Sequence, residues 1–356
     1  MGDRGRIGTL LAATDHDDEA YLDFAEGLRS FTLGAVEPAL RARARSAFEA
    51  FAAAAGHWPA SLEDAHRALD SLPIVAARNR LHRSAQEMMW DGVVATYEKR
   101  RAELEAALDA ADQCGPGTVE YDPAFSYPAY FERVAFHLQP GSYHRDPLAG
   151  YFYHYGTKYL FTGDNDDDEL QQALVDRVRL PADGVVRRVV DLGCAIGQST
   201  TALKKRFPAA EVWGIDLAAP MVRYAHKRAV ELGIPVHFAQ RPAEETRFPG
   251  EAFDLAFAYI LFHEIPIEVA QRVVREVHRI LRPGGIFAVV DMMSAARHTS
   301  ILQDYNREYF AAHNAEPYSL AWVRADFTGM LKAAGFRAVE ERPSGVTISW
   351  LWEATR

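Results

Sequence analysis

A turn of small residues carries the most specific chemistry in this sequence. Residues 189–197, Val-Val-Asp-Leu-Gly-Cys-Ala-Ile-Gly, predict a buried strand that runs into a turn and then a helix. Gly193 and Gly197 let the backbone approach a ligand closely, and the following helix directs free N–H groups at it. Asp191 lies two residues before the first glycine. A carboxylate there favours a ligand that carries a positive amino group.

A dinucleotide is the alternative ligand for such a turn. The dinucleotide motif has its glycines in the spacing G-x-G-x-x-G. Here Gly193 is followed by Ala195 and Gly197, so that spacing is absent. Asp191 would also repel a pyrophosphate. The turn therefore argues against a dinucleotide site.

Two other stretches suggest metal binding, and both fail on their spacing. His263 and Glu264 begin an H-E-x-x-H zinc motif, but Ile267 stands where the second histidine is required. The acidic run 164–169 lacks the glycine and the glutamate of a calcium loop at the required positions. Its acids suit the start of a helix instead. We therefore expect no metal site.

The elements around the turn alternate between strand and helix. From Val185 the pattern predicts strands over 185–193, 211–217, 235–240, 253–261 and 285–292. Helices are expected between them, over 198–206, 220–232 and 267–281. Residues 336–344 and 347–354 predict an antiparallel hairpin at the sheet edge. The fold class is therefore α/β, a doubly wound, mostly parallel seven-stranded sheet with helices on both faces.

Four motifs follow one another along these elements, at 191–197, 214–221, 241–244, and 253–259 with 281–285. In this order they resemble the class I S-adenosylmethionine-dependent methyltransferases, in the small-molecule branch that includes the ubiquinone-type enzymes. The resemblance covers about residues 170–356 and implies a Rossmann-like methyltransferase fold with S-adenosyl-L-methionine as cofactor. It assigns these residues to cofactor binding: Asp191, Gly193, Cys194, Ala195, Gly197, Asp216, Leu217, Met221, Ala243, Glu244 and Tyr259.

Some of these residues have specific roles in the family. An acid at the position of Asp216 accepts both ribose hydroxyls, which suits the two oxygens of a carboxylate. Leu217 and Met221 would flank the adenine, or pack in the core if they have no such role. Ala195 replaces the usual middle glycine of the first motif, so we expect a slightly displaced turn that still binds.

The third motif departs further from the family. Pro242 occupies the position where an acid often lies near the adenine amine. The backbone N–H of Ala243 remains able to meet the adenine ring. Glu244 is the candidate to replace the missing acid.

Methyl transfer to a hydroxyl is helped by a base that removes its proton. His263 is the candidate general base because it follows a strand at the carboxyl edge of the sheet, where ligands of such folds bind. Glu264 would orient it or contact the acceptor. The alternative is a histidine that hydrogen-bonds a backbone carbonyl and closes the loop. An oxygen acceptor is slightly favoured over carbon or nitrogen.

Acceptor-binding candidates lie on both sides of the expected domain. Tyrosines crowd residues 118–163, with His137, His144 and His154 among them. They either pack two domains together or cover an active site. A helical insertion at 294–334 is placed to cover the acceptor. The candidates for acceptor binding are Tyr155, Lys158, Tyr159, Tyr305, Tyr309, Asn314, Glu316 and Tyr318.

The chain divides into three parts. Residues 1–117 predict an all-α domain that caps the acceptor pocket or forms a homodimer, with helices over 38–56 and 81–112 and a helix cap at Ser61. Gly115-Pro116-Gly117 marks its end. Residues 118–168 form an aromatic-rich connection, and 169–356 form the methyltransferase domain.

Composition limits the remaining functions. The 356 residues carry a net charge of −10, which argues against broad capture of nucleic acid. Two cysteines favour a reducing compartment, and no run of about 18 apolar residues predicts a membrane span, so we expect a cytoplasmic protein. The expected partner is a small-molecule acceptor. A protein or nucleic-acid methyltransferase and a non-catalytic S-adenosylmethionine-binding scaffold are the alternatives.

Overall fold

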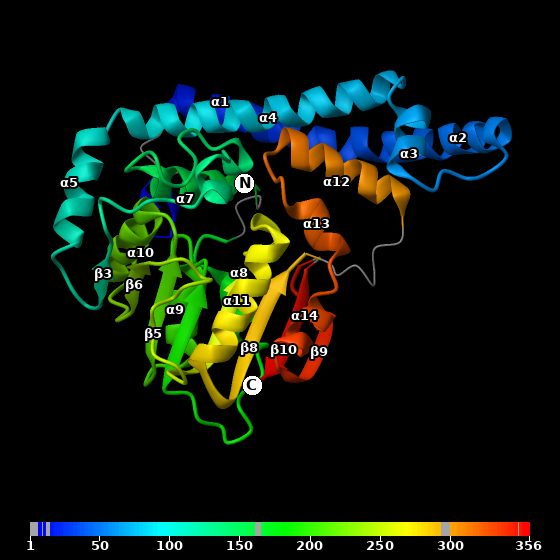
Figure 1. Cartoon of the computed structure of the whole chain (residues 1–356). Coiled ribbons are helices and arrows are strands. Elements are labelled where there is room, and N and C mark those ends of the chain that lie inside the picture. The colour runs from blue at the N-terminus through cyan, green and yellow to red at the C-terminus, as the bar shows by residue number, and fades with distance from the viewer. Residues whose placement is uncertain (1–5, 9, 12–14, 161–164, 293–299, 348) are drawn as a thin grey trace.

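The computed structural model describes residues 6–8, 10–11, 15–160, 165–292, 300–347 and 349–356. The expected start of the insertion at residue 294 lies outside these residues. Eight strands form one sheet in the order β3-β6-β5-β4-β7-β8-β10-β9 (Figure 1). Every pair from β3 to β8 is parallel, and β10 is antiparallel to both of its neighbours. The predicted fold class is therefore confirmed, including the hairpin at the edge.

The bounds of the strands agree with the predicted alternation. In sheet order they are β3 (Thr118–Glu120), β6 (His237–Gln240), β5 (Glu211–Asp216), β4 (Arg188–Leu192), β7 (Phe253–Tyr259), β8 (Leu281–Asp291), β10 (Trp350–Thr355) and β9 (Arg337–Pro343).

One strand lies outside the seven expected from the sequence. β3 belongs to the aromatic-rich connection and adds to the sheet beside β6, with Thr118 opposite His237. Gly117, just before it, has φ +90°, and a Cβ there would lie 1.9 Å from the carbonyl oxygen of Val236. Only glycine fits at that contact. The expected boundary is thus also the point where the chain enters the sheet.

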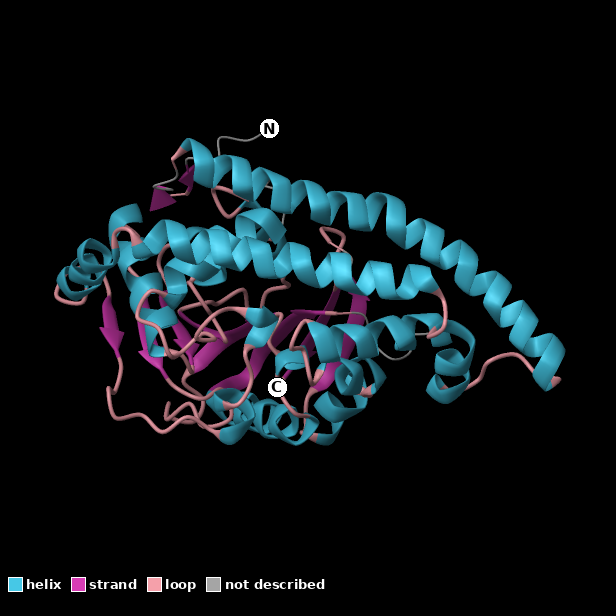
Figure 2. Ribbon diagram, turned by 90° about the horizontal axis from the view of Figure 1, so that it is seen from above, coloured by secondary structure: helices cyan, strands magenta, loops and turns pink. Residues whose placement is uncertain are grey.

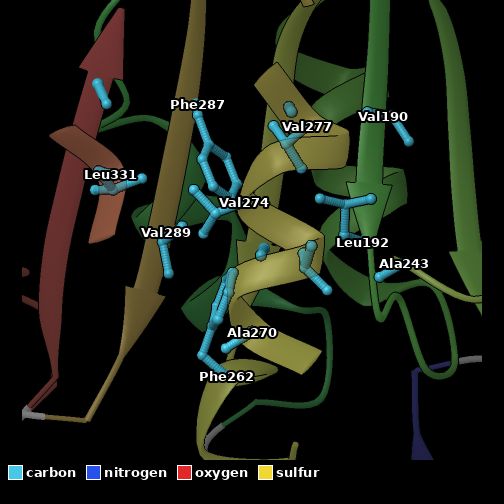
Figure 3. Packing of buried hydrophobic residues seen from close by; sticks show 14 of the residues in the cluster. Val190, Leu192, Ala243, Phe262, Ala270, Val274, Val277, Phe287, Val289 and Leu331 are labelled. Carbon is cyan, nitrogen blue, oxygen red and sulfur yellow. The ribbon is translucent and has the colours of Figure 1, made fainter. Parts of the chain in front are cut away.

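The two faces of the sheet follow the period of two along each strand. Val190, Ala256 and Phe287 pack on one face against α11 (Ile267–Ile280) and α14 (Phe327–Ala333), as Figure 3 shows in part. Leu255 and Ile286 pack on the other face. That face is covered by α8 (Glu169–Val175), α9 (Gln198–Arg206) and α10 (Ala219–Leu232). Burial on both faces explains the nearly continuous apolar runs of the strands.

The N-terminal helices form a layer across the carboxyl ends of the strands (Figures 1 and 2). The layer contains α1 (His16–Phe31), a π-helical turn (Thr32–Val36), α2 (Glu37–Ala55), α3 (Leu62–Leu69), α4 (Pro73–Glu98) and α5 (Arg101–Ala111). Two predicted end signals are confirmed. Gly56 closes α2 at φ +77°, and the Ser61 hydroxyl accepts the backbone N–H of Asp64.

Two expectations for this region are wrong. The single helix expected over 81–112 is broken at Arg100, whose φ and ψ of −123° and 16° are not helical. The break turns α5 onto α10, where Arg223 forms ion pairs with Asp109 and Asp112. Tertiary packing therefore overrides helix propensity here. The region is also not entirely helical, because β1 (Arg6–Ile7) pairs with β2 (Leu10–Leu11).

The connection joins the helical layer to the sheet. It contains α6 (Ala129–Glu132), a 3₁₀ turn (Phe136–Leu138) and α7 (Ala149–Leu160). One apolar cluster contains Trp90 of α4, Tyr155 of α7 and Met221 of α10, so all three parts of the chain share a core. α12 (Ile301–His313) and α13 (Ser319–Arg324) follow β8 and pack beneath the N-terminal helices (Figure 1). No helix among the described residues has the length and apolar character required to span a membrane.

Candidate functional site

One cavity lies at the carboxyl ends of the parallel strands, beneath the helical layer. Its walls include the turn after β4, the end of β5, the segments after β6 and β7, and part of the connection. Many predicted site residues line it together: Gly193, Cys194, Ala195, Asp216, Leu217, Met221, Ala243, Glu244, Tyr259, His263 and Glu264. The strand order alone brings these separated motifs to one edge of the sheet.

The turn after β4 depends on its two glycines. Gly193 has φ +65°, and a Cβ there would lie 2.8 Å from Leu261 Cδ1. Gly197 has φ +76°, and a Cβ there would lie 2.7 Å from Phe238 Cζ. Ala195 adopts φ +45°, a left-handed conformation that disfavours a side chain. The turn thus keeps the conformation that a middle glycine would permit, with a methyl group in place.

Asp191 lies buried beneath this turn, where it does not line the cavity directly. One carboxylate oxygen, Oδ2, accepts hydrogen bonds from the hydroxyls of Ser199 and Thr200, each 2.6 Å away. The other, Oδ1, is buried and has no hydrogen-bond partner among the described residues. Burial raises the pKa of Asp191 to about 7 despite the two hydroxyl donors. A buried acceptor of this kind fits a cationic amino group.

Asp216 ends β5 and lines the cavity. Its two oxygens accept the backbone N–H groups of Ala195 and Ala218, at 3.0 and 2.9 Å. Burial raises its pKa, although both N–H groups act in the opposite direction. Each carboxylate oxygen can accept a further hydrogen bond. The carboxylate is therefore held rigidly and can still accept a pair of hydroxyls, as a ribose requires.

Glu244 is fixed on the cavity wall by the connection. Its Oε1 accepts the hydroxyl of Tyr130 at 2.8 Å. Tyr130 lines the same cavity. The residue expected to replace the missing acid of the third motif is thus present at the site and positioned by a distant segment.

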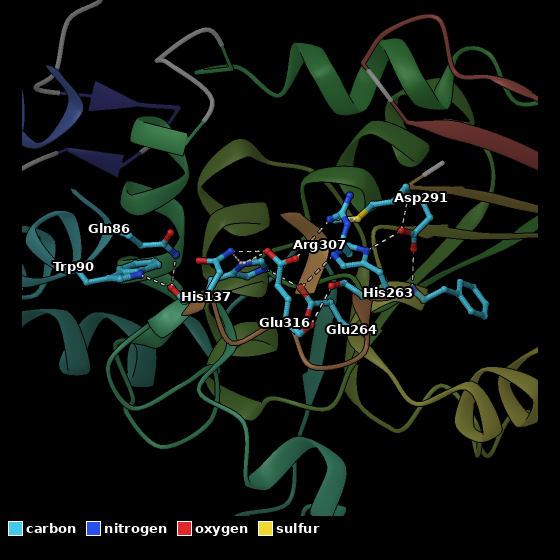
Figure 4. A network of polar contacts seen from close by, with 12 residues as sticks. Gln86, Trp90, His137, His263, Glu264, Asp291, Arg307 and Glu316 are labelled. Carbon is cyan, nitrogen blue, oxygen red and sulfur yellow. Dashed lines mark hydrogen bonds and ion pairs between the residues drawn. The ribbon is translucent and has the colours of Figure 1, made fainter. Parts of the chain in front are cut away.

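Acids and imidazoles alternate in a series of contacts (Figure 4), and three of its members, His137, His263 and Glu264, line the cavity. Asp291 Oδ1 lies 2.7 Å from His263 Nδ1, and His263 Nε2 lies 3.3 Å from Glu264 Oε1. The same oxygen of Glu264 lies 2.7 Å from His137 Nε2. Glu316 Oε1 ends the series, 3.4 Å from His137 Nδ1. Each imidazole therefore lies between two carboxylates.

These pairings shift the pKa values of the two histidines and of Glu264. Burial by itself lowers the pKa of His263, but Asp291 and Glu264 more than compensate and raise it well above its usual range. Burial likewise opposes protonation of His137, and Glu264 and Glu316 raise its pKa to about 10. Burial raises the pKa of Glu264, but the two imidazoles lower it below its usual range. The pairings therefore favour the imidazolium forms of His263 and His137 and the carboxylate forms of Glu264 and Glu316.

Most residues expected to bind the acceptor lie elsewhere. Tyr155 and Tyr159 are buried in the shared core and hydrogen-bond each other. Lys158 pairs with Asp166. Tyr305 donates its hydroxyl to Asp70, and Tyr309 donates to the carbonyl of Asn79. None of these five lines the cavity.

Three acceptor candidates border the cavity through residues that line it. Asn314 lies 3.2 Å from His137 Nδ1, and Glu316 belongs to the acid–imidazole series. Tyr318 donates its hydroxyl to the carbonyl of Tyr130. The insertion thus contributes to the site through the turn between α12 and α13.

Several residues of the connection that line the cavity were not among the specific candidates. They are aromatic residues of the connection and one histidine: Tyr130, Phe131, Phe136, His137, Tyr143 and Tyr153. The concentration of tyrosines in 118–163 indicated the stretch but not its members. Asp291 was also missed, although it ends a parallel strand as Asp216 does. Among the described residues, no group of three or more His, Cys, Asp or Glu could hold a metal ion.

Comparison with known proteins agrees with this geometry. A family model described as a methyltransferase domain matches residues 189–285. Demethylmenaquinone methyltransferase of Thermus thermophilus is 33% identical over 117 residues, 32% of this chain and 51% of that protein. Trans-aconitate 2-methyltransferase of Rhodopseudomonas palustris is 36% identical over 105 residues, 29% of this chain and 38% of that protein. The chain thus spans about half or less of the length of these relatives.

A solved structure was also found. Phosphoethanolamine N-methyltransferase 2 of Haemonchus contortus, in complex with phosphomonomethylethanolamine and S-adenosylhomocysteine, has a TM-score of 0.47 and 14% identity. The match covers 66% of this chain and 61% of that one.

Proposed function

Because residues 189–285 form a domain of the class I S-adenosylmethionine-dependent methyltransferases, we propose that this protein transfers a methyl group from S-adenosyl-L-methionine to a small-molecule acceptor. One observation carries the proposal. Asp216 is held by two backbone N–H groups at the edge of a cavity, next to a turn that covers the unpartnered Asp191 Oδ1. The two acids suit the ribose and the amino group of one ligand.

The bound cofactor supplies a methyl group that its sulfonium already activates. The chain must therefore bind, orient and exclude water. In our proposal Asp191 compensates the amino group, Asp216 accepts the ribose hydroxyls, and the Gly193–Gly197 turn supplies backbone contacts. Leu217 and Met221 flank the adenine. The N–H of Ala243 and the carboxylate of Glu244 face its edge.

We propose an oxygen atom of the acceptor as the preferred site of methylation. His263 has the arrangement of an oriented base, because Asp291 holds its Nδ1 and leaves Nε2 toward the cavity and Glu264. Neutral His263 would take the hydroxyl proton at Nε2 as the oxygen gains the methyl group. The flanking carboxylates of Asp291 and Glu264 raise the pKa of His263 and favour its imidazolium form, so the rate of this step should increase as the pH rises.

The aromatic wall supports a small acceptor with a flat or apolar body. Phe136 and Tyr143 stack with ring centroids 5.7 Å apart, and Tyr143 meets Tyr153 edge to face. These rings line the same cavity as Glu264 and His263. The relatives are named for the methylation of demethylmenaquinone and trans-aconitate, both of them small molecules.

Two alternatives remain distinct in their consequences. A non-catalytic scaffold would bind S-adenosylhomocysteine and methylate nothing. A protein or nucleic-acid methyltransferase would need a substrate that reaches a cavity covered by the helical layer.

A homodimer through the N-terminal helices is a further prediction, favoured by the exposed side chains of Phe24 and Phe31. The mass of the protein in solution, before and after Phe24→Ser with Phe31→Ser, tests it.

The test of the main proposal uses S-adenosylmethionine with a deuterated methyl group and a metabolite extract of the source organism, read by mass spectrometry. Asp216→Ala is run beside the wild type. Asp254→Ala is the matched control, because Asp254 is also a buried acid that accepts two backbone N–H groups, but lies away from the cavity. We expect a labelled product with the wild type and the control and none with Asp216→Ala.

Each other outcome has a distinct meaning. Binding of S-adenosylhomocysteine by calorimetry without any product supports the scaffold. If the protein neither binds S-adenosylhomocysteine nor forms a product, the proposal is contradicted. That result would implicate Ala195 and Pro242 in the loss of the cofactor site.

A further inference from the structure

Two side chains of the N-terminal helix α4 donate to one carbonyl group of the connection. Gln86 Nε2 lies 2.6 Å and Trp90 Nε1 lies 2.7 Å from the carbonyl oxygen of His137 (Figure 4). Gln86 and Trp90 are 3% and 2% exposed, so both donors are removed from solvent. A carbonyl that receives two buried side-chain donors is held more strongly than an ordinary loop carbonyl.

The backbone at this carbonyl adopts a conformation that non-glycine residues avoid. His137 has φ +53° and the next residue, Leu138, has φ +60°. Such residues persist only where their surroundings compensate the strain, and they concentrate at functional sites. The hydrogen bonds from Gln86 and Trp90 of α4 stabilise this backbone conformation at His137. The strained backbone turns the His137 side chain toward the cavity that it lines.

The imidazole of His137 meets charged and polar groups from several elements. Glu264 follows β7 and lies 2.7 Å from Nε2. Asn314 and Glu316, between α12 and α13, lie at Nδ1. His263 faces the other side of Glu264, and Arg307 of α12 faces Glu316 at 3.9 Å. His137 is therefore the link between the connection, the insertion and the sheet.

One oxygen of Glu264 remains for a ligand. Oε1 receives both imidazoles, whereas Oε2 has no hydrogen-bond partner among the described residues. Glu264 lines the cavity beside His263. A carboxylate oxygen accepts hydrogen bonds only. The group that fits it is a hydroxyl or ammonium group on a bound molecule.

We propose that Gln86 and Trp90 are positioning residues of the acceptor site, which hold His137 so that its imidazole orients Glu264 toward a hydrogen-bond donor of the acceptor. The inference rests on the proposed methyl transfer for the identity of that ligand. It gives the N-terminal helices a role in the site that is independent of dimerisation. The acceptor class is a small molecule with a hydroxyl or ammonium group near its aromatic or apolar body.

The test compares Gln86→Met and Trp90→Phe with Thr96→Val in the full-length protein. Gln86→Met keeps the length of the side chain and removes the donor, and Trp90→Phe keeps an aromatic ring. Thr96→Val is the matched control, because Thr96 is a buried polar residue of α4 whose hydroxyl donates only to Gly92 of the same helix.

The first measurement needs no acceptor. Nitrogen-15 NMR of labelled histidine follows the titration of His137, assigned by the loss of its signals in His137→Gln. We expect the His137 titration to move to lower pH in Gln86→Met and Trp90→Phe, because the ring leaves Glu264, and to stay unchanged in Thr96→Val. An unchanged titration in both α4 variants overturns the inference, whether or not the wild type transfers methyl groups.

The second measurement separates the two sides of the cavity. With the labelled product of the wild-type reaction as readout, we expect the KM for the acceptor to rise about tenfold in Gln86→Met. We expect the Kd of S-adenosylhomocysteine to stay within about twofold. An unchanged acceptor KM in an active enzyme contradicts the inference. Absence of both donor binding and product in the wild type instead contradicts the proposed function.

Discussion

The part of the cavity proposed to bind the methyl donor, here the donor side, is formed by residues that lie close to their strands in the sequence. The part proposed to bind the acceptor, here the acceptor side, is formed by segments that lie far apart in the sequence. The donor side consists of the turns that directly follow β4, β5 and β6, so its residues are placed mainly by their own strands, although Tyr130 of the connection also holds Glu244. The acceptor side combines the connection, the insertion and the loop after β7. Local motifs thus form the part expected to bind a common cofactor, whereas long-range packing forms the part expected to select the acceptor.

The two sides also differ in their electrostatics. On the donor side, Asp191 and Asp216 have pKa values raised by burial, and neither forms an ion pair with a cation among the described residues. On the acceptor side, burial raises the pKa values of Glu264 and Glu316, but the imidazolium of His137 between them contributes to lowering both below their usual range. The two carboxylates of the donor side therefore favour a ligand with a positively charged group. The acceptor side is already neutralised by its own residues.

The largest expected effect is on the acceptor side. His263→Ala should lower kcat about 10²–10⁴-fold for a hydroxyl acceptor, because the proposed base is lost. The Kd of S-adenosylhomocysteine should remain unchanged, as measured by calorimetry. His226→Ala is the control, since His226 is a buried histidine that bonds the carbonyl of Cys114 outside the cavity. Unchanged turnover in His263→Ala removes this residue from the mechanism.

The next effect is on the donor side. Asp216→Asn should weaken S-adenosylhomocysteine about 10–100-fold, because hydrogen bonds to a charged group contribute about 1.5–3 kcal/mol. The acceptor KM at saturating cofactor should change much less. Equal losses in cofactor affinity and acceptor KM would show that the two sides do not act separately.

A pH dependence of methyl transfer is expected from the acceptor side. His263 has a raised pKa, so kcat/KM for a hydroxyl acceptor should rise with pH above neutrality as the imidazole loses its proton. Asp291→Asn should move this rise to lower pH, because it removes a carboxylate that stabilises the imidazolium. A profile that is flat from pH 7 to 10 in the wild type argues against a histidine base.

The stability of the folded protein should also depend on pH through His137. The pKa of His137 is raised from about 6.5 when unfolded to about 10 when folded. Its contribution to stability is therefore complete below about pH 6.5 and is lost as the pH rises through 10. The Tm should fall between pH 7 and 10, and His137→Gln should reduce this fall. An equal fall in the variant assigns the effect to other groups.

The smallest expected effect concerns Ala195, which replaces the usual middle glycine of the turn after β4. Ala195→Gly should raise the free energy of unfolding by up to about 1 kcal/mol, because φ +45° no longer opposes a side chain. Part of this gain is offset by the greater entropy of glycine in the unfolded chain. The Kd of S-adenosylhomocysteine should be unchanged or lower. A weaker Kd would mean that the methyl group of Ala195 itself contacts the ligand.

The sequence predicted the sheet well, and it predicted which strand-end residues meet at one cavity, because these signals are local. A strand, a glycine turn and a helix lie within a few residues of one another, and parallel strands bring successive turns to one edge. The sequence could not predict β3, since three residues carry little pattern. The break at Arg100 also escaped, because it depends on the ion pairs of α5 with Arg223.

The choice among the aromatic residues was beyond the sequence for a similar reason. Tyr155 and Tyr153 belong to one helix and have the same chemistry, but one faces the core and the other the cavity. A helix places neighbours two residues apart on different faces. Which face meets the cavity depends on the packing of α7 against α4 and α10.

By itself, the sequence determined the order of the elements, the glycine turn and the acids at the strand ends, because each depends on residues near it in the chain. Tertiary structure alone decided that His137 meets Glu264, which lies 127 positions away, and that Gln86 and Trp90 hold its carbonyl. Such contacts have no period and no motif. They arise when the helical layer closes over the sheet and buries polar groups that must find partners.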